Sequence, residues 1–366
     1  MNTQLRNGLY VSVATIAILG AVAQSAHAQG CIVGRSCTSG QMGSNEYLMP
    51  HEFEWSVNYR GFKANKHYNG DVRQYAREVN QNFVINRQNQ WNASGTLGLT
   101  KQSSVYLDIP YLNNSWGIPM PIGPPAGLRW TQNSTGLGDI SVGYQYWILD
   151  TQKHPEQNIQ LSLGVQAPTG SKDTRSNFPD KTGGNITLKY NDVSIQPGTG
   201  TWEFPFALQA FKEIHSWNVF TQFNYLISPS DTNNVPSLGV QIGSTVNPLA
   251  PSTAKNSVPD QYLFRIGVQH SFPKHPNFTL ALAFRDEGVP VYDLIGKHHG
   301  FRRAGYSHSI EPALTYSKGN SALTIDIPYT IRRDRQPTNP DGTYIKGDST
   351  FADSQLIINF TQRYGK

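Results

Sequence analysis

The strongest constraint on the fold is a pair of neighbouring segments in which apolar and polar residues alternate strictly. Residues 137–149 place an apolar side chain at every second position and mostly small or polar ones between them, and residues 158–167 repeat the pattern after a short connector. Such alternation predicts β-strands with one apolar and one polar face. Strands of soluble sandwiches usually span about 5–6 residues, whereas a transmembrane barrel needs strands of about ten. The two segments therefore predict a hairpin of a transmembrane barrel.

The same alternation recurs along the rest of the chain. We assign strands to residues 52–60, 78–100, 105–111, 137–149, 158–167, 202–210, 217–225, 262–268, 278–284, 310–316, 323–329 and 356–360. A turn near residues 89–92 would divide the second strand and give an odd count, but its unbroken parity favours one strand. Short and long connections alternate, and an even count places both termini in the periplasm. We predict an all-β fold: a closed antiparallel transmembrane barrel of about 12 strands over residues 51–366, with short periplasmic turns and long extracellular loops.

The N-terminus has the features of a secretory signal peptide. Arg6 precedes an uncharged, mostly apolar run over residues 8–23, and Ala26-His27-Ala28 forms a small-residue cleavage site. We predict a signal peptide over residues 1–28 and an irregular segment over residues 29–50; an uncleaved membrane anchor is the alternative. The only cysteines, Cys31 and Cys37, are candidates for a disulfide in an exported compartment. A metal site built on this pair would lack a nearby histidine, and no large aliphatic residue precedes Cys31 to favour lipidation.

Charge and composition narrow the class of protein further. No later segment approaches about 18 consecutive apolar residues, so no helical membrane span is expected. The net charge of +5 is spread along the chain, unlike the dense one-sided basic face of a nucleic-acid-binding protein. We expect contacts with outer-membrane lipids and a small-molecule solute, no nucleic acid and no cofactor. The barrel-assembly machinery commonly recognises a terminal aromatic residue, but here Phe360 is followed by six residues. Either Tyr364 takes that role or the signal lies inside the chain.

Three glycine-rich motifs resemble an outer-membrane family named for the MetA pathway of phenol degradation. They are Gly136-Leu-Gly-Asp-Ile-Ser-Val-Gly-Tyr144, Ala167-Pro-Thr-Gly-Ser-Lys-Asp173 and Pro197-Gly-Thr-Gly-Thr-Trp-Glu-Phe204. The resemblance implies an outer-membrane barrel of a Gram-negative bacterium that moves small compounds, often apolar or aromatic.

The polar parity of the strands identifies candidates for the lumen, because charges are costly on the lipid face. The ionisable lumen candidates are Glu54, Asp108, Asp139, Glu203, Arg265, Arg285, Glu311 and Asp326. They could form a selectivity path or a salt-bridged network that only stabilises the barrel. Two similar segments, Leu107-Asp-Ile-Pro-Tyr111 and Ile325-Asp-Ile-Pro-Tyr329, predict β-bulges at Pro110 and Pro328, because proline removes a ladder hydrogen bond. Such a bulge could open a lateral exit for an apolar solute, or simply end a strand.

The sequence offers little support for an enzyme. His308 has Ser307 and Ser309 as neighbours, but adjacent residues of a strand point to opposite faces, and no Gly-x-Ser-x-Gly elbow is present. We expect a passive channel for small, hydrophobic or aromatic compounds, with a lumen narrowed by loops 113–136, 168–200 and 228–260. The alternatives are a structural or adhesive barrel with a closed lumen and, third, a lipid-modifying enzyme.

Overall fold

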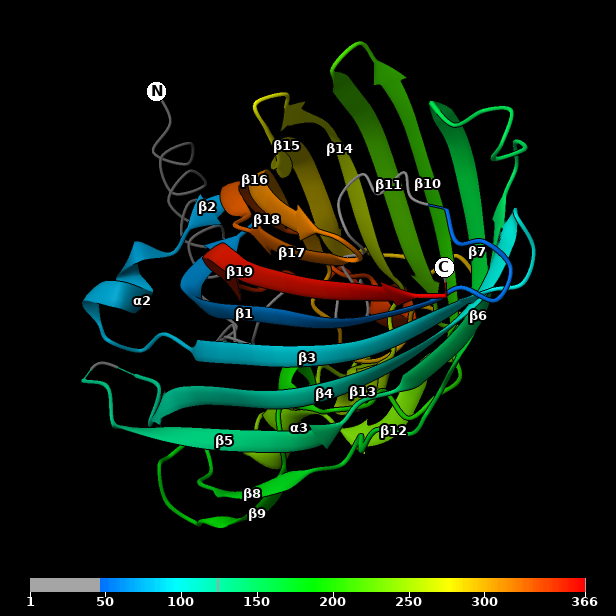
Figure 1. The fold of residues 1–366 in the computed structure, drawn as a ribbon. Helices are drawn as coiled ribbons and strands as arrows, with labels where there is room; N and C mark the ends of the chain where they lie inside the picture. Colours follow the sequence, from blue (N-terminus) through cyan, green and yellow to red (C-terminus); the bar gives the residue numbers. More distant parts are fainter. Residues whose placement is uncertain (1–46, 124, 366) are drawn as a thin grey trace, which may run out of the picture.

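The chain forms one closed β-barrel (Figure 1). The structure is a computed structural model that describes residues 47–123 and 125–365. The signal peptide and the pair Cys31 and Cys37 therefore lie outside the described residues. In the described part, the wall has twelve antiparallel positions, each filled by one strand or by one strand interrupted once. The barrel closes where β1 pairs with β19, from Phe53↔Tyr364 to Tyr68↔Ser349.

Ten wall positions are single strands and two are strands interrupted once. The single strands are β1 (Phe53–Asn69), β3 (Ile85–Gly98), β4 (Ser103–Met120), β7 (Gln157–Ala167), β10 (Phe204–Ile214), β11 (Trp217–Ile227), β14 (Gln261–Phe272), β15 (His275–Val289), β16 (Gly305–Lys318) and β19 (Ser349–Tyr364). The interrupted positions are β5 (Leu128–Leu137) with β6 (Ile140–Trp147), and β17 (Ser321–Asp326) with β18 (Tyr329–Arg335). The predicted twelve-stranded barrel is confirmed.

Side chains of alternating parity give the wall an apolar outer belt and a polar interior. Exposed apolar side chains recur on successive strands, including Val57, Leu107, Val142, Leu163, Leu282 and Ile325. An aromatic row crosses three strands in register, Tyr59↔Trp91↔Tyr111, at the level where amphipathic rings meet lipid headgroups. Among the described residues, no helix is long and apolar enough to cross a membrane.

Several strands extend further beyond the membrane than the sequence pattern predicted. Residues 63–69, expected in a loop, continue β1, and most of the expected loop 113–136 forms the ends of β4 and β5. The second wall strand begins at Ile85, because residues 75–79 form the short helix α2 (Tyr75–Val79). The β4 extension places Trp116, Ile118 and Met120 on its inward face, so apolar burial as well as cross-strand hydrogen bonds specifies it.

The bulges expected at the two prolines lie elsewhere. The β3–β4 register runs unshifted through the pair Asn92↔Pro110. On the other side of β4, the register with β6 and β5 shifts by one residue between the pairs Asp108↔Ser141 and Tyr111↔Leu137, and the extra residue lies between β5 and β6. Pro110 has no N–H to donate there, but its carbonyl still accepts from Gly138 N at 2.8 Å. At Pro328 the strand is interrupted, but its register with β16 does not change. The β16–β18 register shifts further along, between the pairs Ser309↔Thr330 and His308↔Arg332.

The long connections at the extracellular end carry small elements of their own. They are β2 (Val72–Arg73), β8 (Arg175–Phe178), β9 (Thr187–Tyr190), η1 (Val193–Ile195), β12 (Thr232–Pro236), α3 (Leu238–Gln241), η2 (Pro251–Ala254), β13 (Lys255–Ser257) and η3 (Pro340–Gly342). β8, β9, β12, β13 and α3 gather at one end of the barrel (Figure 1). There Val84, Trp116, Ile118 and Met120 pack with loop residues Phe178, Ile195, Leu238 and Ile242 into a buried apolar cluster, so these loops form a packed cap.

Candidate functional site

The lumen contains a cavity of about 280 Å³ enclosed mainly by β1, β3, β4, β6, β7, β10 and β11. Serine, threonine, asparagine and glutamine side chains dominate its lining. A smaller cavity of about 80 Å³ lies towards the cap and shares Thr199 and Gln261 with the larger one. The two cavities therefore line up along the barrel, and Thr199 and Gln261 lie where they meet.

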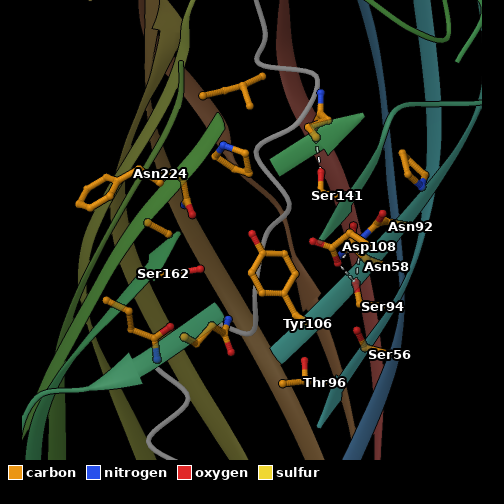
Figure 2. Close-up of a pocket in the computed structure, with 18 of the residues that line it drawn as sticks. Ser56, Asn58, Asn92, Ser94, Thr96, Tyr106, Asp108, Ser141, Ser162 and Asn224 are labelled. Atoms are coloured by element: carbon orange, nitrogen blue, oxygen red, sulfur yellow. Dashed lines mark hydrogen bonds between the residues drawn. The ribbon is translucent and has the colours of Figure 1, made fainter. Parts of the chain in front are cut away.

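Tyr106 lines the large cavity (Figure 2). Ser162 and Asn224 lie on one side of its ring, and Asp108, Ser94 and Asn92 on the other. The ring lies close to the wall at Gly143 and Gly164, where an added Cβ would come within 2.5 Å of the Tyr106 side chain. These two lumen-facing glycines therefore make room for the aromatic ring.

Four of the eight sequence candidates line this cavity, namely Glu54, Asp108, Asp139 and Glu203. The only cationic side chain in the described lining is Arg363, which pairs with Glu54 at 2.8 Å. Four carboxylates and one guanidinium give the lining a formal charge of −3. Asp108 accepts hydrogen bonds from Ser94 and Asn92, and no ion pair joins it to a described residue, so its charge is directed at the cavity without a cationic neighbour.

The other four candidates, Arg265, Arg285, Glu311 and Asp326, lie in a buried charged network that fills the opposite side of the lumen. Glu311 Oε1 lies 3.3 Å from both Arg265 Nη1 and Arg285 Nη1, and Asp326 is close enough to interact with all three.

Two further members of this network, Arg60 and Glu287, were not among the residues predicted from the sequence. Glu287 binds Arg285 at 2.8 Å and Arg60 at 2.9 Å, and Gln355 joins the pair by hydrogen bonds. Glu287 was expected in a loop, but it shares the inward parity of Arg285 and could have been found by extending that strand. Three arginines and three carboxylates give the network a formal charge of zero.

The three glycine-rich motifs meet at one point of the lumen wall. The Asp139 carboxylate, at the break between β5 and β6, accepts hydrogen bonds from Gly170 N at 2.9 Å and Thr199 N at 2.7 Å. These residues stand near the two ends of the loop between β7 and β10. The beginning and the end of the loop touch there, since a Cβ added at Gly198 would clash with the Gly170 carbonyl oxygen and lie 2.7 Å from Asp139 Oδ1. Asp139 therefore ties both ends of this loop to the wall.

Glu203 adds a second tie at the end of the same loop. Its carboxylate is fully buried and accepts hydrogen bonds from Gln166, from the Thr199 hydroxyl and from Ser228. Strand parity predicted that Asp139 and Glu203 face the lumen, but not that they anchor a loop.

The anchored loop turns inward and narrows the lumen. Ser194 in η1 accepts hydrogen bonds from Asn86 at 2.7 Å and Gln88 at 3.0 Å, both on the lumen face of β3. Asp192 caps η1 through Ser194 N and pairs with Arg303 at 2.6 Å. We call residues 192–199 the constriction segment. It lies between the cap and the large cavity.

The loop between β11 and β14 is fixed beside the constriction segment by Asp260. Its carboxylate accepts from Ser228 N at 2.7 Å, Leu294 N at 2.7 Å and the Tyr225 hydroxyl at 2.9 Å. Burial raises the pKa of the Asp260 carboxyl above its ordinary value. Of the three loops expected to narrow the lumen, loops 168–200 and 228–260 contribute to the cavities, whereas the expected loop 113–136 mainly lengthens the wall.

An aromatic cluster occupies part of the periplasmic end of the lumen. Trp147, Phe211 and Phe220 point inward from β6, β10 and β11 and are buried. Tyr47, which precedes β1, packs edge-on against Trp147 with ring centroids 5.0 Å apart and lies 6.2 Å from Phe211. Its hydroxyl donates to the His154 carbonyl at 3.2 Å. The segment before β1 thus enters the periplasmic mouth.

Replacing Tyr47 with alanine should widen this mouth. Two aromatic contacts stabilise the docked segment by about 2 kcal/mol in total, which corresponds to roughly a thirtyfold change in docked occupancy. We expect Tyr47→Ala to raise single-channel conductance in planar bilayers. Tyr47→Phe keeps both ring contacts and should leave conductance near the wild-type value; equal conductance in Tyr47→Ala and wild type would show that the segment does not restrict the mouth.

The histidine considered for catalysis faces away from the lumen. His308 stacks on Tyr306 with centroids 4.8 Å apart and lies 3.6 Å from Asp286. Ser307 and Ser309 are buried on the opposite, inward face. The structure therefore does not bring His308 and either serine together.

Comparisons with known proteins identify the fold. No family model and no curated protein matches the chain. A solved outer-membrane channel from Pseudomonas putida F1 superposes with a TM-score of 0.56 at 11% identity, covering 89% of this chain and 100% of that one.

The CymD monoaromatic hydrocarbon channel (TM-score 0.41, 8% identity, 87% and 90% of the two chains covered) and the Pseudomonas putida toluene transporter TodX (0.43, 8%, 92% and 95%) superpose more loosely. The closed wall, the apolar belt and the closer superposition together show that the protein is a twelve-stranded β-barrel of the Gram-negative outer membrane.

Proposed function

We propose that the protein is a passive outer-membrane channel for small, hydrophobic or aromatic compounds that also carry a hydrogen-bonding group. The observation that carries this proposal is the 280 Å³ cavity inside a closed barrel. An apolar cavity of about 150 Å³ is large enough for benzene, so this one has room for a substituted ring. Tyr106, Trp147 and Leu112 offer apolar contact surface, and the surrounding hydroxyl and amide groups offer hydrogen bonds.

The three motifs support a place in the family named for the MetA pathway of phenol degradation, as a divergent member. Their residues meet at Asp139 and shape the loop that narrows the lumen, which gives the shared sequence a physical purpose. The residues before β1 complete the proposed organisation: a signal peptide over residues 1–28, a segment over residues 29–50 whose end occupies the periplasmic mouth, and the barrel over residues 51–366.

The charge of the lining favours neutral or cationic solutes over anions. A carboxylate in a narrow lumen attracts cations and repels anions, because screening by water is reduced there. Asp108 is the carboxylate best placed to act on a passing ion, since Glu54, Asp139 and Glu203 are engaged by Arg363, by loop N–H groups and by several side chains.

Replacing Asp108 with asparagine should therefore reduce cation preference. Under a KCl gradient in a planar bilayer, we expect the wild-type reversal potential to indicate preference for K⁺, and Asp108→Asn to move it towards zero. Asp150→Asn, in an exposed periplasmic turn, changes the net charge equally and should have little effect. A wild-type channel that prefers anions, or an unchanged potential in Asp108→Asn, would contradict this assignment.

A further inference from the structure

The outer surface above the aromatic row carries an unusual group of cations. Lys63 and Arg87 are directly paired in the β1–β3 register, and both side chains point outward. Arg129 lies two strands away on β5, where its guanidinium sits 4.9 Å from the Phe83 ring centroid. The strands β1, β3, β4 and β5 run side by side across this region (Figure 1). We call Lys63, Arg87 and Arg129 the basic face.

The basic face has no acidic partners. No ion pair joins its three side chains to a described residue, and the strand segments 61–69, 85–90, 112–120 and 128–136 contain no aspartate or glutamate. Several other cations at this end of the barrel are paired: Lys66 and Arg333 with Asp353, Arg73 with Glu78, Arg77 with Asp348, Arg302 with Asp293, and Arg303 with Asp192. The basic face is therefore a local excess of positive charge.

Its height on the barrel is defined by the strand register. Arg87 lies four residues beyond Trp91 of the aromatic row, about 13 Å along the strand. With strands tilted by roughly 40°, the vertical rise is about 10 Å. The aromatic row marks the headgroup level, so Lys63 and Arg87 lie at or just beyond the headgroups of the outer leaflet. Arg129 lies further out, eight residues beyond Tyr111 in the β4–β5 register.

The side chains around the cations are suited to anionic oxygen atoms. Exposed Asn113 and Asn133 lie among them on β4 and β5. Arg129 Nη1 donates to the carbonyls of Phe83 at 2.9 Å and Gly117 at 3.0 Å. These bonds hold the guanidinium flat on the wall, which lowers the entropy cost of binding a phosphate with its remaining N–H groups.

We propose that the basic face binds the phosphate groups of lipid A, the phosphorylated glycolipid of the outer leaflet. Lys63 and Arg87 are at the height of its headgroup and Arg129 lies just outside them; all three are directed outward and form no ion pair with a described residue, and the apolar belt below them would pack along its acyl chains. This site is separate from the lumen, and so its test does not depend on the proposed transport function.

The test compares a variant of the basic face with a variant of equal charge change. The first is Lys63→Gln/Arg87→Gln/Arg129→Gln. The control is Lys101→Gln/Lys153→Gln/Lys212→Gln, at the periplasmic turns and the adjoining end of β10. Detergent-purified barrels, checked for folding by heat-modifiable mobility on gels, are titrated with lipid A, with dephosphorylated lipid A, and with lipid A in the presence of inorganic phosphate.

We expect the first variant to bind lipid A roughly a hundredfold more weakly than wild type, at about fivefold per cation, and the control variant to bind like wild type. Dephosphorylated lipid A should bind wild type as weakly as lipid A binds the first variant. Equal lipid A binding by all three proteins, or equal binding of both lipids by wild type, would overturn the proposal. Full displacement by millimolar phosphate would also overturn it, because the site would then recognise a free anion.

Discussion

Replacing Asp139 with alanine should open the constriction and raise the conductance of the channel. The carboxylate accepts hydrogen bonds from two backbone N–H groups, of Gly170 and Thr199, at 2.9 and 2.7 Å. Each charge-assisted bond contributes about 1.5 kcal/mol or more, and their loss leaves both N–H groups without that acceptor. A change of about 3 kcal/mol alters the ratio of released to docked loop roughly a hundredfold.

Single-channel recording in planar bilayers measures this effect. We expect larger or longer openings in Asp139→Ala, and a smaller effect in Asp139→Asn, because the amide keeps one acceptor oxygen. Asp180→Ala is the matched control: Asp180 is in the same loop, but it accepts hydrogen bonds from Thr182 within a local turn. A folded Asp139→Ala barrel with wild-type conductance would show that this carboxylate does not control the constriction.

Replacing Arg285 with methionine should destabilise the barrel more than any surface change. Arg285 and its partners Glu287 and Glu311 are 0% exposed, and Arg285 contacts both carboxylates. Removing one member of a buried charge network leaves an uncompensated charge, which costs about 3–5 kcal/mol. Arg363→Met removes a partly exposed pair with Glu54 and should cost no more than about 1 kcal/mol.

Urea unfolding in lipid vesicles, followed by tryptophan fluorescence, measures both changes in the free energy of unfolding. The double variant Arg285→Met/Glu311→Gln restores neutrality and should lose less stability than the two single variants summed. Additive losses, or a loss in Arg285→Met no larger than in Arg363→Met, would show that the six charges do not act as one network.

The sequence predicted the wall of the barrel best where lipid is in contact with it. Within the membrane, one face of each strand must be apolar and the other must suit the lumen, so parity alone placed Val142 outside and Gln145 inside. Beyond the membrane, the outer faces of β4 and β5 are wet, and their inner faces lie under the loops, where polar as well as apolar side chains are buried. Residues such as Asn113 and Asn114 then give no alternation, and the strand is specified by its neighbours rather than by its own pattern.

The candidate site was predicted as a list of inward residues, but not as an arrangement. Parity placed Asp108 and Arg285 in the same lumen without showing that one faces a cavity and the other is neutralised. That distinction depends on which strands face each other across the barrel. The glycine-rich motifs were recognised only as a resemblance to a family, and only the path of the loop shows that Gly170 and Gly198 both lie against Asp139.

The most direct test of the central claim is the flux of a small aromatic solute into sealed vesicles containing the purified barrel, with no energy source. We predict that phenol equilibrates faster than in protein-free vesicles, at a rate proportional to its gradient and to the amount of barrel. Flux equal to that of protein-free vesicles, together with no measurable conductance, would contradict a channel and favour a barrel whose lumen stays closed.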